Sequence, residues 1–179
     1  MIEKKINNNE EEISKEIDET LDFKDLNLLK YIKNFFNSDL LSLDSCENVL
    51  TEQLFYWKIN SFYLTCKIDR IDFLNNKTIR IYDYKTSTNK NDDNYLFQIK
   101  TYICGISDLY NISVDNIEGI IFYLGDGSKN IVKITNKEKE NTINNILNII
   151  ENIKNADFNN INFQKCKNFC NFKDFCFSK

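Results

Sequence analysis

The feature that most constrains the fold is the alternation of two hydrophobic periods along the chain. Strand-like runs, separated by turn residues, cover residues 48–59, 61–73, 78–85, 116–124 and 130–135. Helical spacing of apolar side chains covers residues 25–36, 95–110 and 138–153. The order helix, three strands, helix, two strands, helix predicts one α/β domain in which helices flank the sheet.

Composition excludes several classes of function. The 179 residues contain no His, which rules out histidine general bases, Ser-His-Asp triads and histidine zinc sites. The four Gly build neither a P-loop nor a dinucleotide-binding fingerprint. The formal charge is −4, so any basic surface for a nucleic acid must be local.

The termini and the cysteines indicate a compartment. No run approaches the roughly 18 consecutive apolar residues of a membrane helix. The charged start at residues 1–5 lacks the apolar stretch of a signal peptide. We therefore expect an intracellular, cytoplasmic protein without a membrane partner. In that reducing compartment the six Cys point to buried thiols or a metal site.

A pair of carboxylates and a lysine carries the clearest chemistry. Asp83 and Lys85 lie two apart in a strand and therefore share a face, and a hairpin partner can place Asp69 opposite them. Carboxylates that hold Mg²⁺ or Mn²⁺, together with an ammonium, suit phosphodiester hydrolysis. Taken singly, D-x-K is usually a solvated strand edge, and Asp69 beside Arg70 is as readily a surface ion pair.

A helical pair completes the pattern. Gln98 and Tyr102 are four residues apart and share a helix face that can lie across the end of the sheet and order the lysine. Alone they would suggest only an exposed helix face. The argument rests on order and spacing, with 14 residues from Asp69 to Asp83 and 13 from Lys85 to Gln98.

Three segments together resemble the PD-(D/E)XK nuclease superfamily. They are KIDRID (67–72), IYDYKTS (81–87) and QIKTY (98–102). The likeness spans roughly residues 30–179 and is greatest to the RecB-type branch of helicase–nucleases and CRISPR-adaptation enzymes. It implies a restriction-endonuclease-like core with a mixed β-sheet over 25–160, a charged N-terminal arm or helix at 1–24, and a Cys-rich tail at 161–179.

The resemblance also implies roles for single residues. The ligands of Mg²⁺ or Mn²⁺ would be Asp69, Asp83 and the carbonyl of Tyr84. The catalytic lysine would be Lys85, with the accessory motif on Gln98 and Tyr102. The family places its ligand at the first aspartate of KIDRID, so Asp69 is preferred to Asp72. Glu52 matches a glutamate often found on the first strand, and we expect it to be a buried or rim charge rather than a direct ligand.

The tail cysteines are spaced C-x3-C-x5-C at Cys166, Cys170 and Cys176. Several RecB-type nucleases end with the similar run C-x2-C-x5-C, which holds a 4Fe–4S cluster with one distant cysteine, here Cys46. The resemblance thus favours such a cluster, with Zn²⁺ or free thiols as the alternatives. Two further cysteines lie in apolar periodic runs and are expected to be buried core thiols: Cys66 and Cys104.

The sequence leads to three functional hypotheses. The first is a metal-dependent deoxyribonuclease, an exonuclease on single-stranded DNA ends that works with a helicase in repair or recombination. Its phosphate contacts would come from Lys85, Lys90 and Lys100, with Lys67 or Arg70 as further candidates. The second is an inactive nuclease-fold module, stabilised by an Fe–S cluster or Zn²⁺, for DNA binding or scaffolding, because the upstream His that the family usually has is missing. The third is a protein-interaction domain with affinity for neither metal nor DNA.

Overall fold

The computed structural model describes residues 26–43, 45–87 and 92–155. The arm expected at 1–24 and the tail expected at 161–179 lie outside the described residues. The chain divides into two units, residues 1–143 and residues 144–179. The fold and the candidate site belong to the first unit, and the described part of the second is the continuation of one helix.

In the described part of the chain, five strands form a mixed sheet in the order β1-β2-β3-β4-β5. They are β1 (Cys46–Ile59), β2 (Phe62–Leu74), β3 (Ile79–Lys85), β4 (Ile117–Tyr123) and β5 (Ser128–Val132). The first three strands form an antiparallel meander, β3 and β4 are parallel, and β5 returns antiparallel to β4. The turn into β5 uses Gly127 at φ 72°, a conformation that side chains rarely adopt. The predicted mixed sheet is confirmed.

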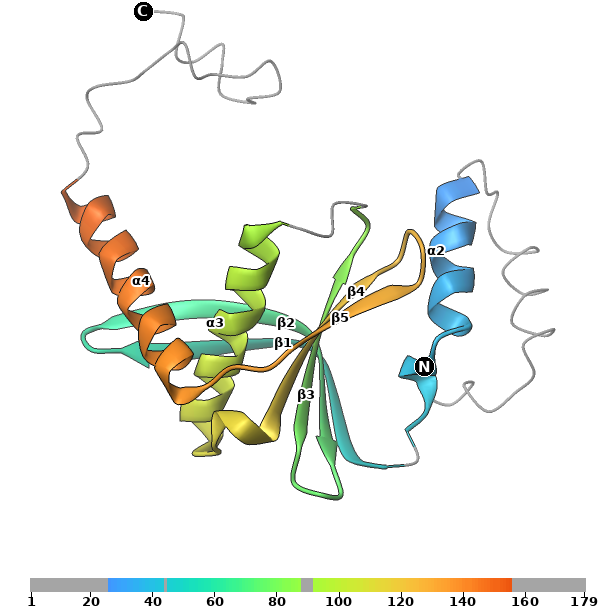
Figure 1. Cartoon of the computed structure of the whole chain (residues 1–179), viewed down its shortest axis with the longest axis horizontal. Helices are drawn as coiled ribbons and strands as arrows, with labels where there is room; N and C mark the ends of the chain where they lie inside the picture. Colours follow the sequence, from blue (N-terminus) through green and yellow to red (C-terminus); the bar gives the residue numbers. More distant parts are fainter. Residues whose placement is uncertain (1–25, 44, 88–91, 156–179) are drawn as a thin grey trace, which may run out of the picture. The chain divides into compact units, whose positions relative to one another are not determined.

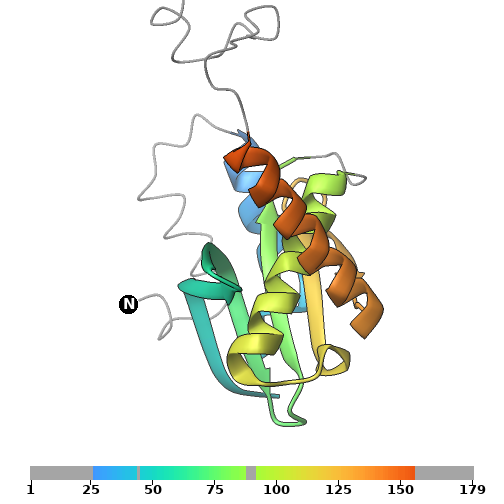
Figure 2. The same cartoon turned by 90° about the vertical axis from the view of Figure 1, so that its left-hand side faces the viewer.

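Helix α3 (Asp93–Tyr110) connects the parallel strands β3 and β4, a connection that a short turn cannot make. It begins two residues earlier than predicted because the Asp92 side chain accepts a hydrogen bond from the Asn94 N–H and caps it. A Cβ atom at Gly119 of β4 would lie 2.5 Å from Cγ1 of Ile99. The absence of a side chain there lets α3 lie close against the sheet (Figure 2).

Helix α2 (Leu26–Phe36) lies on the other side of β3 and β4 from α3 (Figure 1). Phe35 packs edge-to-face on Tyr84 at 5.6 Å and on Phe122 at 6.4 Å between ring centroids. The short 3₁₀ turn η1 (Asp39–Leu41) follows and adds Leu40 to this core. The strand that carries Asp83 and Lys85 is therefore covered on both faces, which restricts the movement of its side chains.

Two further elements complete the unit. The 3₁₀ turn η2 (Val114–Asn116) leads into β4, and α4 (Asn136–Lys154) follows β5. Thr135 and Glu138 form a reciprocal capping box, so α4 begins two residues before the predicted start. Lys139, in the part of α4 that belongs to the first unit, pairs with Asp108 of α3. The three helices of the described chain occupy the predicted positions.

Beyond the last pair with β3, strands β1 and β2 continue as a two-stranded hairpin. Its buried side is formed by Phe55 and Trp57, which approach Gly105 of α3. The ladder pairs Thr51 with Arg70 and Gln53 with Ile68, but the intervening Glu52 has φ 53°, in the left-handed region. This interruption of β1 lies opposite Asp69 in the register.

Candidate active site

Asp83 and Lys85 lie at the carboxyl end of β3 and point to the face covered by α3. The Lys85 Nζ is 2.7 Å from Oδ2 of Asp83, and the two side chains are 16% and 6% exposed. Their spacing of two residues in a strand explains this shared face. An ion pair that is shielded from water to this extent needs further polar contacts from the protein to offset the cost of desolvating its charges.

Asp69 reaches the same place from β2. The ladder between β2 and β3 ends with Arg70 opposite Tyr82, so the next position sets Asp69 opposite Asp83. There the Oδ2 of Asp69 accepts a hydrogen bond of 2.8 Å from the backbone N–H of Tyr84. The N–H and C=O of one residue in an extended strand point the same way. The Tyr84 carbonyl is therefore directed toward β2 as well.

The Oδ2 of Asp83 has an ion-pair partner but no hydrogen bond of standard geometry among the described residues. It is buried, and its partner among the described residues is the Lys85 ammonium, with Nζ at 2.7 Å. Burial raises the pKa of the Asp83 carboxyl, the Lys85 ammonium opposes the rise, and the Asp69 carboxylate adds to it. Two neighbouring carboxylates, Asp83 and Asp69, with the single Lys85 ammonium to offset their charges, fit a further cation as a partner.

The donor set matches a hard cation. Two carboxylates and one backbone carbonyl are oxygen ligands of the kind Mg²⁺ and Mn²⁺ prefer, and Mg²⁺ commonly keeps waters beside one or two carboxylates. Within the described ranges, no group of three or more His, Cys, Asp or Glu side chains is placed to hold a metal ion. Two carboxylates and one carbonyl fill only part of an octahedral shell, so an ion held by Asp69 and Asp83 would keep coordination positions for water and substrate.

Helix α3 holds the lysine through a chain of polar contacts. Lys85 Nζ donates to Oε1 of Gln98 at 2.8 Å, and Nε2 of Gln98 donates to the hydroxyl of Tyr102 at 2.8 Å. The ammonium also lies 4.6 Å from the centre of the Tyr95 ring, within cation–π range. Burial raises the pKa of the Tyr102 hydroxyl, so it stays protonated at neutral pH.

Tyr95 was not anticipated from the sequence. It precedes Gln98 by three residues and Tyr102 by seven, so the three side chains share one face of α3. That spacing was available in the sequence as a signal. The sequence does not show that this face of α3 meets Lys85 rather than solvent.

The second half of KIDRID has a different role. The Arg70 guanidinium donates to both carboxylate oxygens of Asp72 at 2.6 Å, and its Nη1 donates to the Leu40 carbonyl at 2.6 Å. Both side chains are buried. The expectation that Arg70 contacts phosphate is therefore wrong, because its donors face Asp72 and the backbone of η1. Both carboxylate oxygens of Asp72 accept hydrogen bonds from Arg70, whereas Asp69 lies beside Asp83.

The other candidate charges that the structure describes, Lys67 and Lys100, form ion pairs with glutamates. Lys67 forms an exposed ion pair with Glu52, so the Glu52 carboxylate faces that lysine. Lys100 is 3.1 Å from Glu138 at the start of α4. Lys90 lies outside the described residues. Of the predicted phosphate contacts within the described ranges, Lys85 is the one whose ammonium lies beside the paired carboxylates.

The cysteines are only partly described. Cys66 and Cys104 are buried, as predicted, and burial raises the pKa of each thiol to about 11. Cys46 is half-buried at the start of β1, and burial raises its thiol pKa too. Three cysteines lie outside the described residues, so the iron–sulfur expectation stays a prediction: Cys166, Cys170 and Cys176.

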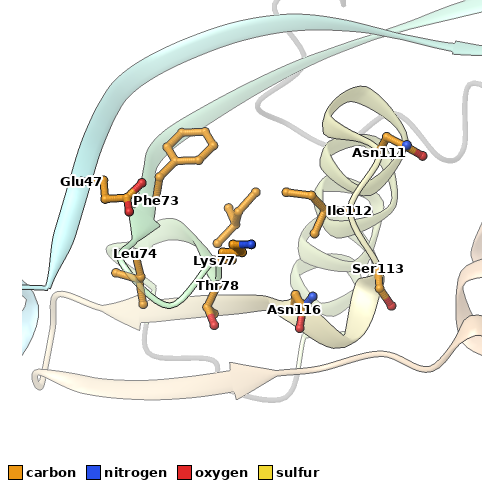
Figure 3. Close-up of a pocket in the computed structure, with 10 residues that line it drawn as sticks. Glu47, Phe73, Leu74, Lys77, Thr78, Asn111, Ile112, Ser113 and Asn116 are labelled. Atoms are coloured by element: carbon orange, nitrogen blue, oxygen red, sulfur yellow. The ribbon is translucent and has the colours of Figure 1, made fainter.

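A separate hollow lies at the opposite end of β3 (Figure 3). Its volume is about 380 Å³, and Ile79 at the start of β3 lines it together with Glu47, Lys77 and Asn111. Lys85 follows Ile79 by six positions along β3, a distance of roughly 20 Å. The hollow is therefore not part of the carboxylate–lysine site.

The family follows from comparison of the sequence with known families. The PD-(D/E)XK nuclease superfamily matches residues 7–177, and the chain belongs to this superfamily of nucleases. The five-stranded mixed sheet with flanking helices is consistent with its restriction-endonuclease-like α/β fold. No curated protein gives a significant match to the sequence. In the described part of the chain, no helix has the length and apolar character needed to cross a membrane.

Proposed function

We propose that this domain hydrolyses phosphodiester bonds in DNA at the site formed by Asp69, Asp83 and Lys85. The observation that carries the proposal is the buried Asp83 carboxylate, which is paired with Lys85 and lies beside a second carboxylate, Asp69. Membership of a nuclease superfamily supports the reaction class. The carboxylates of Asp69 and Asp83, with the Tyr84 carbonyl, would hold Mg²⁺ or Mn²⁺.

Such an ion, when bound, polarises the scissile phosphate and lowers the pKa of a bound water. The chain's own contribution is to place Lys85. Its ammonium, positioned by Gln98 and the Tyr95 ring, would orient the attacking water and offset negative charge that builds on the phosphate oxygens. Gln98 and Tyr102 act as positioning residues, because they reach the reaction through the lysine.

We further propose an exonuclease that acts on single-stranded DNA ends and works with a helicase in repair or recombination. The support is the resemblance of KIDRID, IYDYKTS and QIKTY to RecB-type nucleases. On the same resemblance, a 4Fe–4S cluster, or Zn²⁺ in its place, would be held by Cys46, Cys166, Cys170 and Cys176. The position of Cys46 outside the fully buried core is compatible with that role.

A second candidate is a nuclease-fold module that binds DNA without cutting it. The observation in its favour is the absence of His from the sequence. By the family resemblance, a histidine upstream of Asp69 would be expected to complete the metal site. The two candidates differ in a measurable property. The active enzyme must bind Mn²⁺ through Asp83, whereas the inactive module has no need of that affinity.

The decisive experiment uses the full chain, purified anaerobically, with Mn²⁺ and end-labelled single-stranded DNA. Wild type should cut, and Lys85→Ala should not. Lys129→Ala is the matched control, because Lys129 also pairs with an aspartate, Asp39, but lies on β5. A folded wild type that leaves the DNA intact, or a Lys85→Ala variant as active as wild type, would contradict the proposal.

Calorimetric titration with Mn²⁺ gives a readout independent of cleavage. Wild type should bind Mn²⁺, Asp83→Asn should bind it much more weakly, and Asp115→Asn, at an exposed aspartate of η2, should match wild type. Iron and sulfide analysis of the same preparation tests the cluster. Wild type that binds Mn²⁺ no better than Asp83→Asn would favour the inactive module.

A further inference from the structure

The hairpin of β1 and β2 presents an exposed face that the core does not use. We call it the hairpin face, and it consists of Leu54, Tyr56, Lys58, Tyr63, Thr65 and Lys67. The register pairs Leu54 with Lys67, Tyr56 with Thr65, and Lys58 with Tyr63. Three large side chains are strongly exposed there, with Leu54 at 53%, Tyr56 at 61% and Tyr63 at 67%.

The opposite side of the hairpin already supplies its packing. Phe55, Trp57 and Ile59 alternate with the exposed residues and are buried. The Trp57 indole N–H donates to Asp108 of α3 at 2.9 Å. The two exposed tyrosines are therefore not needed to anchor the hairpin. A group of exposed apolar side chains beside a candidate active site calls for a binding partner as its explanation.

The tyrosines have the arrangement of a stacking surface. The register makes Tyr56 and Tyr63 diagonal neighbours on the hairpin face, a relation that places Cα atoms roughly 7–8 Å apart. Two aromatic rings at that spacing can stack with successive unpaired bases. Stacking of this kind tolerates any base, because every base has a flat face.

The charges on the same face are those that a polyanion requires. Lys58 forms no ion pair with the described residues, and Lys67 is paired with the exposed Glu52. The chain as a whole is acidic, with a formal charge of −4, so Lys58 beside Tyr63, with no carboxylate partner among the described residues, is a local exception. Protein surfaces that stack on bases combine aromatic rings with such cations along the phosphate backbone.

The hairpin face leads away from the candidate site. Lys67 precedes Asp69 by two residues on β2, and Tyr63 precedes it by six, or about 20 Å of strand. The hairpin face points away from α3, whereas Asp83 and Lys85 point toward it. Beyond Arg70 no β3 partner is paired with β2 in the described chain, so a nucleic-acid strand held at Asp69 and Asp83 can pass over this edge of β2 to reach the hairpin face.

We propose that the hairpin face binds the single-stranded nucleic acid that adjoins the scissile phosphate. Tyr56 and Tyr63 stack on its bases, and Lys58 and Lys67 contact its phosphates. This inference rests on the proposed nuclease function and specifies how that site holds its substrate.

The test measures binding of a fluorescently labelled single-stranded oligonucleotide to the full chain in EDTA, where no metal-dependent cleavage occurs. The double variant Tyr56→Leu/Tyr63→Leu keeps apolar area but removes the rings, and we expect about tenfold weaker binding or more. The Trp double variant should restore binding. Tyr110→Leu, at an exposed tyrosine at the end of α3, should bind as wild type does. Lys58→Gln should reduce the slope of log binding constant against log salt concentration by the amount expected for about one phosphate contact.

The outcomes separate this inference from the proposed function. Leu variants that bind the oligonucleotide as tightly as wild type overturn the inference. A loss of oligonucleotide affinity that appears with Tyr→Ser but not with Tyr→Leu shows that the face needs apolar area rather than rings, and it reassigns the face to binding an apolar protein segment. Mn²⁺-dependent cleavage of a very short oligonucleotide, which cannot reach Tyr63, reports on the site alone. Wild type that binds through the tyrosines but never cuts refutes the nuclease and keeps the hairpin inference. Wild type that neither binds nor cuts refutes both.

Discussion

The close approach of α3 to β4 makes Gly119→Ala an informative perturbation. A Cβ atom at this position would lie 2.5 Å from Cγ1 of Ile99 and 3.0 Å from Cδ1 of Ile103, where ordinary contact begins at 3.4 Å. The helix or these side chains must yield by roughly 1 Å. Overpacking of this size costs about 1–3 kcal/mol of unfolding free energy.

The same displacement should reach the candidate site, because Ile99 is next to Gln98, which holds Lys85. A shift of about 1 Å in a catalytic group can lower the rate by about 100-fold. We therefore expect Gly119→Ala to lose far more DNA cleavage than its unfolded fraction explains. Urea unfolding and single-turnover cleavage on the same preparation measure the two effects.

Ile99→Ala provides the compensating change. Alone it should cost about 2–5 kcal/mol by leaving a cavity. Combined with Gly119→Ala, the added methyl occupies part of that cavity, so the double variant should be about 0.5–3 kcal/mol more stable than the sum of the single effects predicts. Strictly additive losses, or a Gly119→Ala variant with unchanged stability, would refute the packing argument.

Three further predictions concern polar contacts. Asp72→Ala should destabilise the fold by about 3–5 kcal/mol in urea unfolding, because it leaves the buried Arg70 guanidinium without its anion; an unchanged midpoint would contradict this. Gln98→Ala should slow cleavage roughly tenfold or more at saturating Mn²⁺, since Lys85 loses a hydrogen bond to its charged group, while Mn²⁺ affinity measured by calorimetry stays near wild type. Hydrogen bonds from Lys133 and Arg80 lower the pKa of Glu118 in the folded protein. The ionised carboxylate therefore stabilises the fold at pH values above the ordinary pKa of a glutamate, and this stabilisation is lost as the pH falls through the lowered pKa of the folded state. Glu118→Gln should therefore cost about 1 kcal/mol at neutral pH and nothing in acid, and an equal loss at both pH values in urea unfolding would refute the linkage.

Hydrophobic period allowed the sheet and helices to be predicted with small errors at their ends. The errors at the helix starts have a local cause, since α3 and α4 begin earlier than their apolar stripes because Asp92 and Thr135 cap them. The return strand, expected at 130–135, is instead β5 (Ser128–Val132). The order of Asp69, Asp83, Lys85 and Gln98 led to the expectation of one constellation, and strand parity explains why Asp83 and Lys85 share a face.

Long-range partners could not be predicted in the same way. Arg70 looked like a surface charge in the sequence, yet it is buried against Asp72 and the Leu40 carbonyl, 30 residues away. Tyr95 resembles any aromatic residue in a helix until the packing of α3 on β3 brings it to Lys85. Sequence period tells which side of an element is apolar, but not which neighbour that side meets.

The hydrogen bond from the Tyr84 N–H to Asp69 occupies the position that a backbone carbonyl of β2 would take in a longer ladder. The paired segment of β2 and β3, from Phe73–Ile79 to Arg70–Tyr82, thus acts as a spacer. Its number of residue pairs fixes how far Asp69 and Asp83 lie from the turn. One residue inserted within either strand would move Asp69 out of line with Asp83 and reverse the faces beyond it. An insertion between Asn75 and Thr78 would only lengthen the turn. Length differences among natural relatives of this chain should therefore be found in the turn and not in the spacer.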